Sequence, residues 1–444
     1  MAARLLSNFK VSTLAIKRFS QSDDDFEAQV CVLKAPMEAL DPNLVSSVRD
    51  IIAEVRLRGD RALLEFTQRF DQHPATSVSE LVFDSDMLKD FESQITAAER
   101  SAITEAAQRI RRYHEEQISP DWSITDEHGS QLGQRVRPMQ RVGLYVPGGK
   151  ASYPSSVLMN TIPAKVAGVA EVVMVAPTPA GQVNPLVLAA ASLAGVDQVV
   201  TVGGAQAVAA LAYGTESISA ADKIVGPGNR YVAEAKRQVF GKVGIDMIAG
   251  PSEIFVIADG TVDPDWIALD LMSQAEHDEM AQAVCIATSE DYLDGVTESL
   301  EKLLPDMPRR DVIAASLRNR GALISVPDLL TAASLSNQFA PEHLELAVAS
   351  PEELLPTISS AGAVFLGAYS SESLGDYCAG TNHVLPTSGA ARFSSPLSVY
   401  DFQTRTSIIN ITRSGANALA EVAGTIADSE SLPAHARAAR ARKD

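Results

Sequence analysis

The fold is decided by two neighbouring stretches, QVVTVGGAQAVAALAYG at residues 198–214 and DKIVGPGNRYVAEAKRQVFG at residues 222–241. Each stretch begins with a short apolar run, passes through a glycine loop and continues with apolar residues at helical spacing. The order strand, glycine loop, helix is the repeating unit of parallel α/β sheets. We therefore expect a parallel sheet here, with helices covering both of its faces.

The same alternation of strands and helices continues along the chain in both directions. Strand-like runs stand at RVGLYVPGG (141–149), EVVMVAP (171–177), IFVIAD (254–259), AVCIATS (283–289), ALISV (322–326), HLELAV (343–348) and AVFLG (363–367). Helical patterns separate most of these runs. Two such arrays in series predict two similar, incomplete Rossmann-like αβα domains with parallel sheets and a cleft between them.

The ends of the chain carry helical patterns instead. Residues 23–120 hold apolar side chains at three- and four-residue steps with few strand signals, and the last 40 residues return to helix. We expect the following division: an N-terminal segment at 1–40, a helical region at 41–140 packing on the second α/β domain, an α/β domain with the glycine loops at 141–252, a second α/β domain at 253–395, and a small helical domain at 396–444.

Composition excludes several classes of protein. The 444 residues are 46% hydrophobic and carry a net charge of −19, so neither nucleic acid nor an anionic membrane surface is an expected partner. Apolar runs stay below the ~20 residues of a membrane span. The three cysteines are too few and too scattered for a disulfide framework, which favours a reducing, cytoplasmic setting. Residues 1–22 have the basic, acid-free composition of an organelle transit peptide, but we prefer a short basic lead-in.

A polar group interrupts an apolar helical segment in DLMSQAEHDEMAQAV, residues 270–284. Gln274 and His277 are three positions apart, so a helix would place them on one face. Together with Asp376 and His435 they offer nitrogen and oxygen ligands for a borderline divalent cation. The pattern is weak by itself, because an amide is an unusual zinc ligand and because His383 and Glu276 compete as donors. His73, His114, His128 and His383 have no partner pattern and are expected on the surface or in packing roles.

Two further features suit a reaction site. Glu342 and His343 stand side by side just before a strand, and an imidazole next to an acid suits proton transfer, although the pair alone is better explained as a turn with a capping Glu and a surface His. The loops at 145–149, 202–206 and 225–229 each follow a strand, which suits a phosphate-binding rim at the strand ends. None of these loops is a G-x-G-x-x-G fingerprint.

At these residues the sequence resembles the histidinol dehydrogenases. The resemblance covers residues 20–440 and rests on long segments in order: RVGLYVPGG, VGGAQAVAALAYGTES, KIVGPGNRYVAEAKR, IDMIAGPSEI, SQAEHD, FAPEHLEL, GDYCAGTNHVLPT and ARFSSPLSVYDF. It implies a zinc-dependent, NAD-dependent four-electron oxidation of L-histidinol through L-histidinal to L-histidine, using two NAD and one zinc ion per subunit. Histidinol and NAD are then the small-molecule partners.

The resemblance also assigns roles to single residues. It implies Glu342 and His343 as catalytic residues, with His343 as the base for both hydride transfers and Glu342 activating water or the diol. The implied zinc ligands are Gln274, His277, Asp376 and His435. The implied substrate contacts are Ser252, Gln274, His277, His343, Asp376, Glu430 and His435, and the implied NAD contacts are Tyr145, Gln206 and Asn229. The zinc is expected to hold the imidazole and amino nitrogens of the substrate.

The resemblance further implies a homodimer in which the C-terminal segment crosses to the neighbour, so that Glu430 and His435 complete the neighbouring site. Aldehyde oxidation often uses a thiolate, and Cys378 lies in a motif region, but a hydrate route through Glu342 and His343 needs no cysteine. Two alternatives remain. A paralogue acting on another small alcohol, such as a sulfonated diol, would use the same machinery, and a metal-binding structural protein would not need the Glu342–His343 pair.

Overall fold

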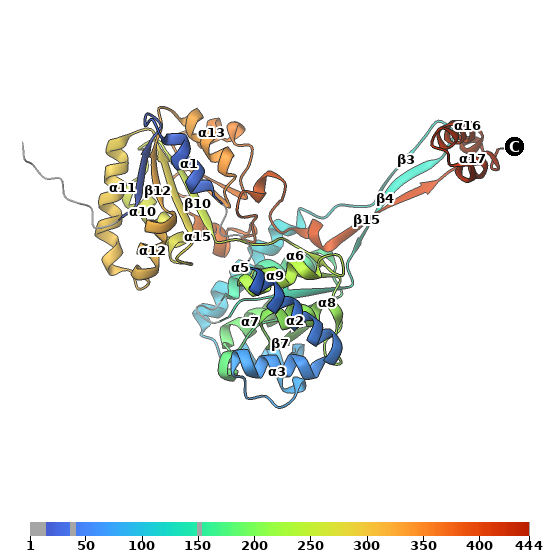
Figure 1. Cartoon of the computed structure of the whole chain (residues 1–444), viewed down its shortest axis with the longest axis horizontal. Helices are drawn as coiled ribbons and strands as arrows, with labels where there is room; N and C mark the ends of the chain where they lie inside the picture. Colours follow the sequence, from blue (N-terminus) through green and yellow to red (C-terminus); the bar gives the residue numbers. More distant parts are fainter. Residues whose placement is uncertain (1–14, 36–40, 149–152, 444) are drawn as a thin grey trace, which may run out of the picture.

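The computed structural model describes residues 15–35, 41–148 and 153–443. It contains two six-stranded sheets and one three-stranded antiparallel ribbon. Figure 1 shows the two sheets in separate bodies, with the ribbon projecting away from both. The prediction of two α/β domains with parallel sheets is confirmed. Within the described residues, no helix has the length and apolar character that a membrane crossing requires.

The first α/β domain is built on a sheet with the strand order β2-β7-β6-β5-β8-β9, in which only β2 runs antiparallel to its neighbour. The side chains of β6 alternate between two apolar cores, with Val172 and Met174 on one face and Val173 and Val175 on the other. Its strands are β2 (Val82–Asp84), β5 (Arg141–Tyr145), β6 (Glu171–Val175), β7 (Gln198–Val200), β8 (Lys223–Val225) and β9 (Gly244–Ile245), and its crossover helices are α6 (Pro154–Ala167), α7 (Pro185–Ala194), α8 (Gly204–Tyr213) and α9 (Arg230–Val239).

The second α/β domain has the order β1-β12-β11-β10-β13-β14, and all of its pairings are parallel. Its strands are β1 (Lys17–Ser20), β10 (Glu253–Ala258), β11 (Gln282–Ala287), β12 (Ala322–Ser325), β13 (His343–Ala347) and β14 (Ala363–Leu366), and its helices are α1 (Phe26–Lys34), α10 (Pro264–Ala275), α11 (Glu290–Leu303), α12 (Arg310–Arg320), α13 (Leu329–Phe339), α14 (Pro351–Leu354) and α15 (Glu372–Leu374). The N-terminal segment is therefore not a separate helical piece, since β1 forms an edge of this sheet.

The two sheets share one winding pattern. In each sheet, three consecutive strands are added side by side toward one edge. The chain then returns and places the next strand on the other side of the first. The order thus reverses between β5 and β8 in one sheet and between β10 and β13 in the other. In open α/β sheets, ligands bind in the crevice beside such a reversal, outside the carboxyl ends of the strands.

Region 41–140 packs mainly on the first α/β domain, whereas the sequence predicted packing on the second. Its helices α2 (Pro42–Arg58) and α3 (Asp60–Asp71) pack against α8, while α4 (Ser85–Phe91) and α5 (Ala97–Glu115) pack against α7 and α6. These contacts belong to the first domain, and α5 also contacts the Gly375–Ala379 turn of the second. The buried apolar stripe of α2, which includes Val48 and Ile52, joins the core formed by Val173 and Val200. The helices lie there because that face of the first sheet would otherwise expose its valine side chains.

The C-terminal part is more than a pair of helices. Strand β15 (Gln403–Asn410) pairs with β4 (Gln131–Pro138), which pairs with β3 (Trp122–Thr125), and the ribbon leads to α16 (Arg413–Ser429) and α17 (Pro433–Arg440). In Figure 1 the two helices lie at the far end of this ribbon, away from both α/β bodies. Two of the ribbon strands thus come from the region that the sequence predicted to be helical.

Candidate active site

The catalytic candidates lie at the amino ends of β10 and β13. His343 begins β13 beside Ile254, and both His343 and the preceding Glu342 are buried. Glu342 Oε2 accepts a hydrogen bond from the Glu253 backbone N–H at 2.9 Å. The site therefore stands at the end of this sheet opposite to the carboxyl-end crevice where α/β folds usually bind ligands.

Both ring nitrogens of His343 have partners. Nδ1 lies 2.9 Å from the Glu253 carbonyl oxygen and 3.0 Å from Gln274 Nε2, so it has an acceptor when it carries a proton and a donor when it does not. Nε2 lies 3.3 Å from Asp376 Oδ1. When Nδ1–H donates to the Glu253 carbonyl, the lone pair of Nε2 is free to accept a proton from a bound molecule.

Burial and charge shift the acid–base properties of the pair. Complete burial raises the pKa of Glu342 to about 8, against the opposing effect of the His343 charge. Burial by itself lowers the pKa of His343, but the carboxylates of Glu342, Asp376 and Glu372 outweigh it and raise that pKa well above the usual value. A carboxyl and an imidazole that both hold protons tightly are suited to general acid–base work near neutral pH.

Three of the four proposed metal ligands gather around this pair. Gln274 is in the last turn of α10, and its side-chain oxygen Oε1 is buried without a hydrogen-bond partner among the described residues. His277 lies in the turn that follows α10 rather than inside the helix as predicted, with its N–H donating to the Gln274 carbonyl at 3.2 Å. It is close enough to Asp376 and His343 for their charges to act on it.

The protonation of these groups suits a cation. Burial lowers the pKa of His277, which favours the neutral imidazole that a metal requires. Burial would favour a neutral Asp376, but the hydrogen bond and charge of His343 hold its pKa below the usual value. A neutral imidazole, an ionised carboxylate and an unpartnered amide oxygen are three donors suited to a divalent cation. That these residues bind zinc remains a prediction.

A second donor set overlaps with the first. The ligand atoms of His343, Glu372 and Asp376 lie within 4.8 Å of one another. We favour the Gln274 set, because Glu372 already accepts a hydrogen bond from the Ser273 hydroxyl at 2.9 Å. An unpartnered buried oxygen costs free energy that a bound cation would recover, and Gln274 has one.

Three acidic groups of the site were not predicted from the sequence. Glu372 and Glu345 are buried beside His343, and the Glu372 backbone N–H donates to Glu345 Oε1 at 2.8 Å. Asp270 forms a side-chain hydrogen bond with Glu345, and burial raises the pKa of Asp270 to about 6. His383, expected on the surface or in a packing role, is partly buried, and its Nδ1 lies 2.9 Å from the Asp376 carbonyl oxygen.

The remaining predicted ligand and substrate contacts are not brought to this place. Glu430 ends α16 and His435 lies in α17, and both side chains are exposed. Figure 1 places these helices at the opposite end of the molecule from α10 and α15. Within one chain, Glu430 and His435 therefore do not meet Gln274 and Asp376.

The proposed NAD contacts lie in the first domain. Tyr145 ends β5, Gln206 lies in the first turn of α8, and Asn229 caps α9, so all three stand at carboxyl ends of the strands, beside the β5–β8 reversal. Tyr145 is buried, which raises its pKa to about 12, and its hydroxyl oxygen accepts the Gly204 N–H at 3.0 Å. Gln206 is buried as well, and Asn229 is exposed. Gly149 of the first glycine loop lies outside the described residues.

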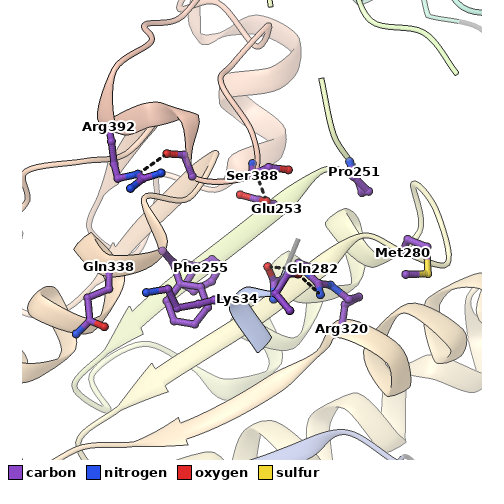
Figure 2. Close-up of a pocket in the computed structure, with 13 residues that line it drawn as sticks. Lys34, Pro251, Glu253, Phe255, Met280, Gln282, Arg320, Gln338, Ser388 and Arg392 are labelled. Atoms are coloured by element: carbon purple, nitrogen blue, oxygen red, sulfur yellow. Dashed lines mark hydrogen bonds between the residues drawn. The ribbon is translucent and has the colours of Figure 1, made fainter. Parts of the chain in front are cut away.

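A cavity opens next to the catalytic pair on the other side of Glu253. Figure 2 shows its lining, which includes Glu253, Gln282 and Arg320 but neither Glu342 nor His343. Ser252 stands just before β10 and is partly buried. Cys378 packs on the apolar core of the first domain, and this environment provides no support for a nucleophilic role.

Comparison with known proteins gives one consistent result. The sequence model of the histidinol dehydrogenase family matches residues 35–443. The chain is 59% identical over 428 residues to the histidinol dehydrogenase of Pseudomonas aeruginosa, covering 96% of this chain and 97% of the relative. It is 58% identical over 429 residues to that of Dechloromonas aromatica, covering 97% and 99%. The crystal structure of histidinol dehydrogenase from Elizabethkingia anophelis matches with a TM-score of 0.91 at 34% identity, covering 96% of this chain and 98% of that one.

Proposed function

The chain belongs to the histidinol dehydrogenase family and is an oxidoreductase; from that premise we propose that it oxidises L-histidinol through L-histidinal to L-histidine, using two NAD and one zinc ion per subunit. One observation supports the proposed chemistry most strongly. A buried acid–imidazole pair, Glu342 and His343, lies directly beside the unpartnered amide oxygen of Gln274.

The zinc part of the proposal rests on the donor set. Gln274, His277 and Asp376 would supply three ligands, which leaves room for a fourth protein ligand and for the substrate. When bound, zinc would hold the imidazole and amino nitrogens of the substrate in place, and NAD would accept the hydride. The chain's own residues provide the proton chemistry.

In the alcohol step, the substrate carbon loses a hydride and its hydroxyl oxygen loses a proton. His343 Nε2 is the acceptor for that proton, because Nδ1–H is held by the Glu253 carbonyl at 2.9 Å. The carboxylates that raise the pKa of His343 would be partly neutralised by a bound cation, which would leave Nε2 unprotonated and able to act as the base near neutral pH. The Asp376 carboxylate at 3.3 Å then stabilises the imidazolium that forms.

In the aldehyde step, one water adds to the carbonyl and the resulting diol loses a second hydride and a second proton. Glu342, with a pKa of about 8, is the group that takes the proton from the attacking water or from the diol. Its Oε2 is 3.7 Å from His343 Nδ1. The two groups can thus serve consecutive steps without leaving the site, and neither step requires a thiolate.

NAD would be held at the β5–β8 reversal of the first sheet by Tyr145, Gln206 and Asn229. The glycine backbones there allow close approach, and the N-terminus of α9 is favourable for a pyrophosphate. Because Tyr145 and Gln206 are buried, they would contact the dinucleotide from the floor of the site, whereas the exposed Asn229 would contact it at the rim.

A homodimer would complete the site. Glu430 and His435 are exposed on a unit that stands away from the rest of the chain, so a neighbour's site is the natural place for them to act (Figure 1). The same unit exposes Ile409, Ile426 and Leu432, with Ile409 70% accessible. Grouped exposed apolar side chains mark an interaction surface. Glu430 of the partner subunit would face the substrate, and His435 of the partner subunit would be the fourth zinc ligand.

Metal removal tests the proposal directly. Protein stripped with a chelator should lose histidinol oxidation, and adding zinc back to one ion per subunit should restore it. A sample dialysed without chelator is the control. Full activity in a preparation shown to be free of metal would contradict the zinc assignment, and an inactive metal-loaded enzyme would contradict histidinol as the substrate.

A further inference from the structure

The first domain contains a fully buried ion pair that the reaction chemistry does not use. Lys236 in α9 and Asp246, just after β9, form this pair with side chains only 3% and 1% exposed. Burying two opposite charges costs free energy that a well-packed apolar pair would not cost. A feature of this kind therefore needs a geometric reason, and the contacts of the pair supply one.

Both members of the pair hold the backbone of a single residue. Asp246 Oδ2 accepts the Gly226 N–H at 2.7 Å, and Lys236 Nζ donates to the Gly226 carbonyl at 2.9 Å. The ion pair thus closes around Gly226 and fixes both of its hydrogen-bonding groups. Gly226 is the first residue after β8 and begins the loop that leads to Asn229.

Gly226 occupies a position with no spare room. Its φ is +104°, and a Cβ placed there would lie 2.1 Å from the Tyr145 carbonyl oxygen. The Tyr145 hydroxyl in turn accepts the Gly204 N–H of the neighbouring loop. A small displacement of Gly226 would therefore shift the end of β5 and the loop at Gly204 relative to the loop that follows β8.

We infer that Lys236 and Asp246 are positioning residues for the dinucleotide: they hold the Gly226–Asn229 loop in the conformation that binds NAD. The inference rests on the proposed function, because it takes that loop to be the NAD site. The pair touches neither Glu342 nor His343. Its loss should therefore weaken NAD binding while leaving the chemical step and the alcohol site intact.

The experiment compares Lys236→Met with the double variant Lys236→Met/Asp246→Leu. In the holoenzyme, the Kd and KM for NAD should rise on the order of tenfold in both variants, with kcat at saturating NAD and the KM for histidinol within about twofold. The double variant is needed because it leaves no unpaired buried charge and folds even where the single variant does not. Lys223→Met is the matched control, since Lys223 is in β8 and pairs with Asp401 at 2.9 Å without touching the loop.

The double variant separates positioning from packing. If the ion pair only fills space, an apolar pair restores the stability measured by thermal unfolding and restores NAD affinity as well. Wild-type affinity for NAD in a folded double variant would overturn the inference alone. A wild-type protein that fails to bind NAD would overturn the proposed function and the inference with it.

Discussion

Replacing Glu342 by glutamine should separate the two oxidation steps. The substitution keeps the size of the side chain and a carbonyl oxygen that can still accept the Glu253 N–H, so the fold around β10 and β13 should be retained. It removes only the ability to take a proton. We expect oxidation of histidinal to fall strongly and oxidation of histidinol to histidinal to fall much less, because His343 is the base of the first step.

The size of the effect follows from the acid–base properties of the site. General-base catalysis contributes about 10²–10⁴-fold, or about 3–5 kcal/mol of transition-state stabilisation. Burial raises the pKa of Glu342 to about 8, so the carboxylate form is scarce below that pH and dominant above it. The aldehyde step of the unmodified enzyme should therefore quicken about tenfold from pH 7 to pH 9. The glutamine variant should lose this dependence on pH.

The assay supplies histidinol and histidinal as separate substrates and follows NADH formation in each half-reaction. Glu353→Gln, at an exposed carboxylate on α14, is the matched control and should leave both rates unchanged. His343→Ala should lower both rates. Equal losses in the two half-reactions for Glu342→Gln, or an unchanged pH profile of its aldehyde step, would refute the division of roles.

Three further predictions concern the metal, the dimer and the buried acids. His277→Ala should lose bound zinc and activity together, as measured by metal analysis of the purified protein; retention of one zinc ion per subunit would exclude His277 as a ligand. Mixing His435→Ala with His343→Ala under subunit exchange should restore about a quarter of the unmodified activity, since half of the dimers are hybrids with one intact site; verified exchange without recovery would exclude the crossed tail. Burial raises the pKa of Glu372 to about 7, so the folded metal-free protein binds more protons than the unfolded chain above pH 4.5. Stability should then fall with rising pH between about 4.5 and 7, by up to about 1.4 kcal/mol per pH unit for this group, and Glu372→Gln should flatten the urea-denaturation profile.

The α/β domains could be predicted because their signals are local. Each strand, glycine loop and helix of the arrays lies within about 20 residues, and the valine-rich runs are buried on both faces. The ribbon was missed for the opposite reason. Strand β4 pairs with β15, which lies far along the chain, and QLGQRVRP has no alternating apolar pattern because its side chains are mostly exposed.

The site was predictable in part. Glu342, His343, Gln274 and Asp376 could be singled out from sequence, and the structure brings them together. Glu345 could also have been predicted, because an acid two residues after His343 in an apolar strand must point to the same buried face as His343. Other members depended on tertiary contacts.

Three such residues show why sequence spacing fails for the rest of the site. Glu372 reaches His343 from α15 and Asp270 reaches Glu345 from α10, and neither has a sequence neighbour that marks it. His383 is fixed by the Asp376 backbone carbonyl, a contact that no pattern of residue types announces. Their roles follow from the folding of the 367–395 loop and α10 against β13.

The number of NADH molecules formed per histidinol shows whether one enzyme carries out both oxidation steps. With zinc-loaded protein, excess NAD and limiting L-histidinol, we expect two NADH per histidinol and L-histidine as the only amino-acid product. One NADH per histidinol with accumulating histidinal would contradict the four-electron oxidation, and no NADH from histidinol would contradict the assignment of the substrate.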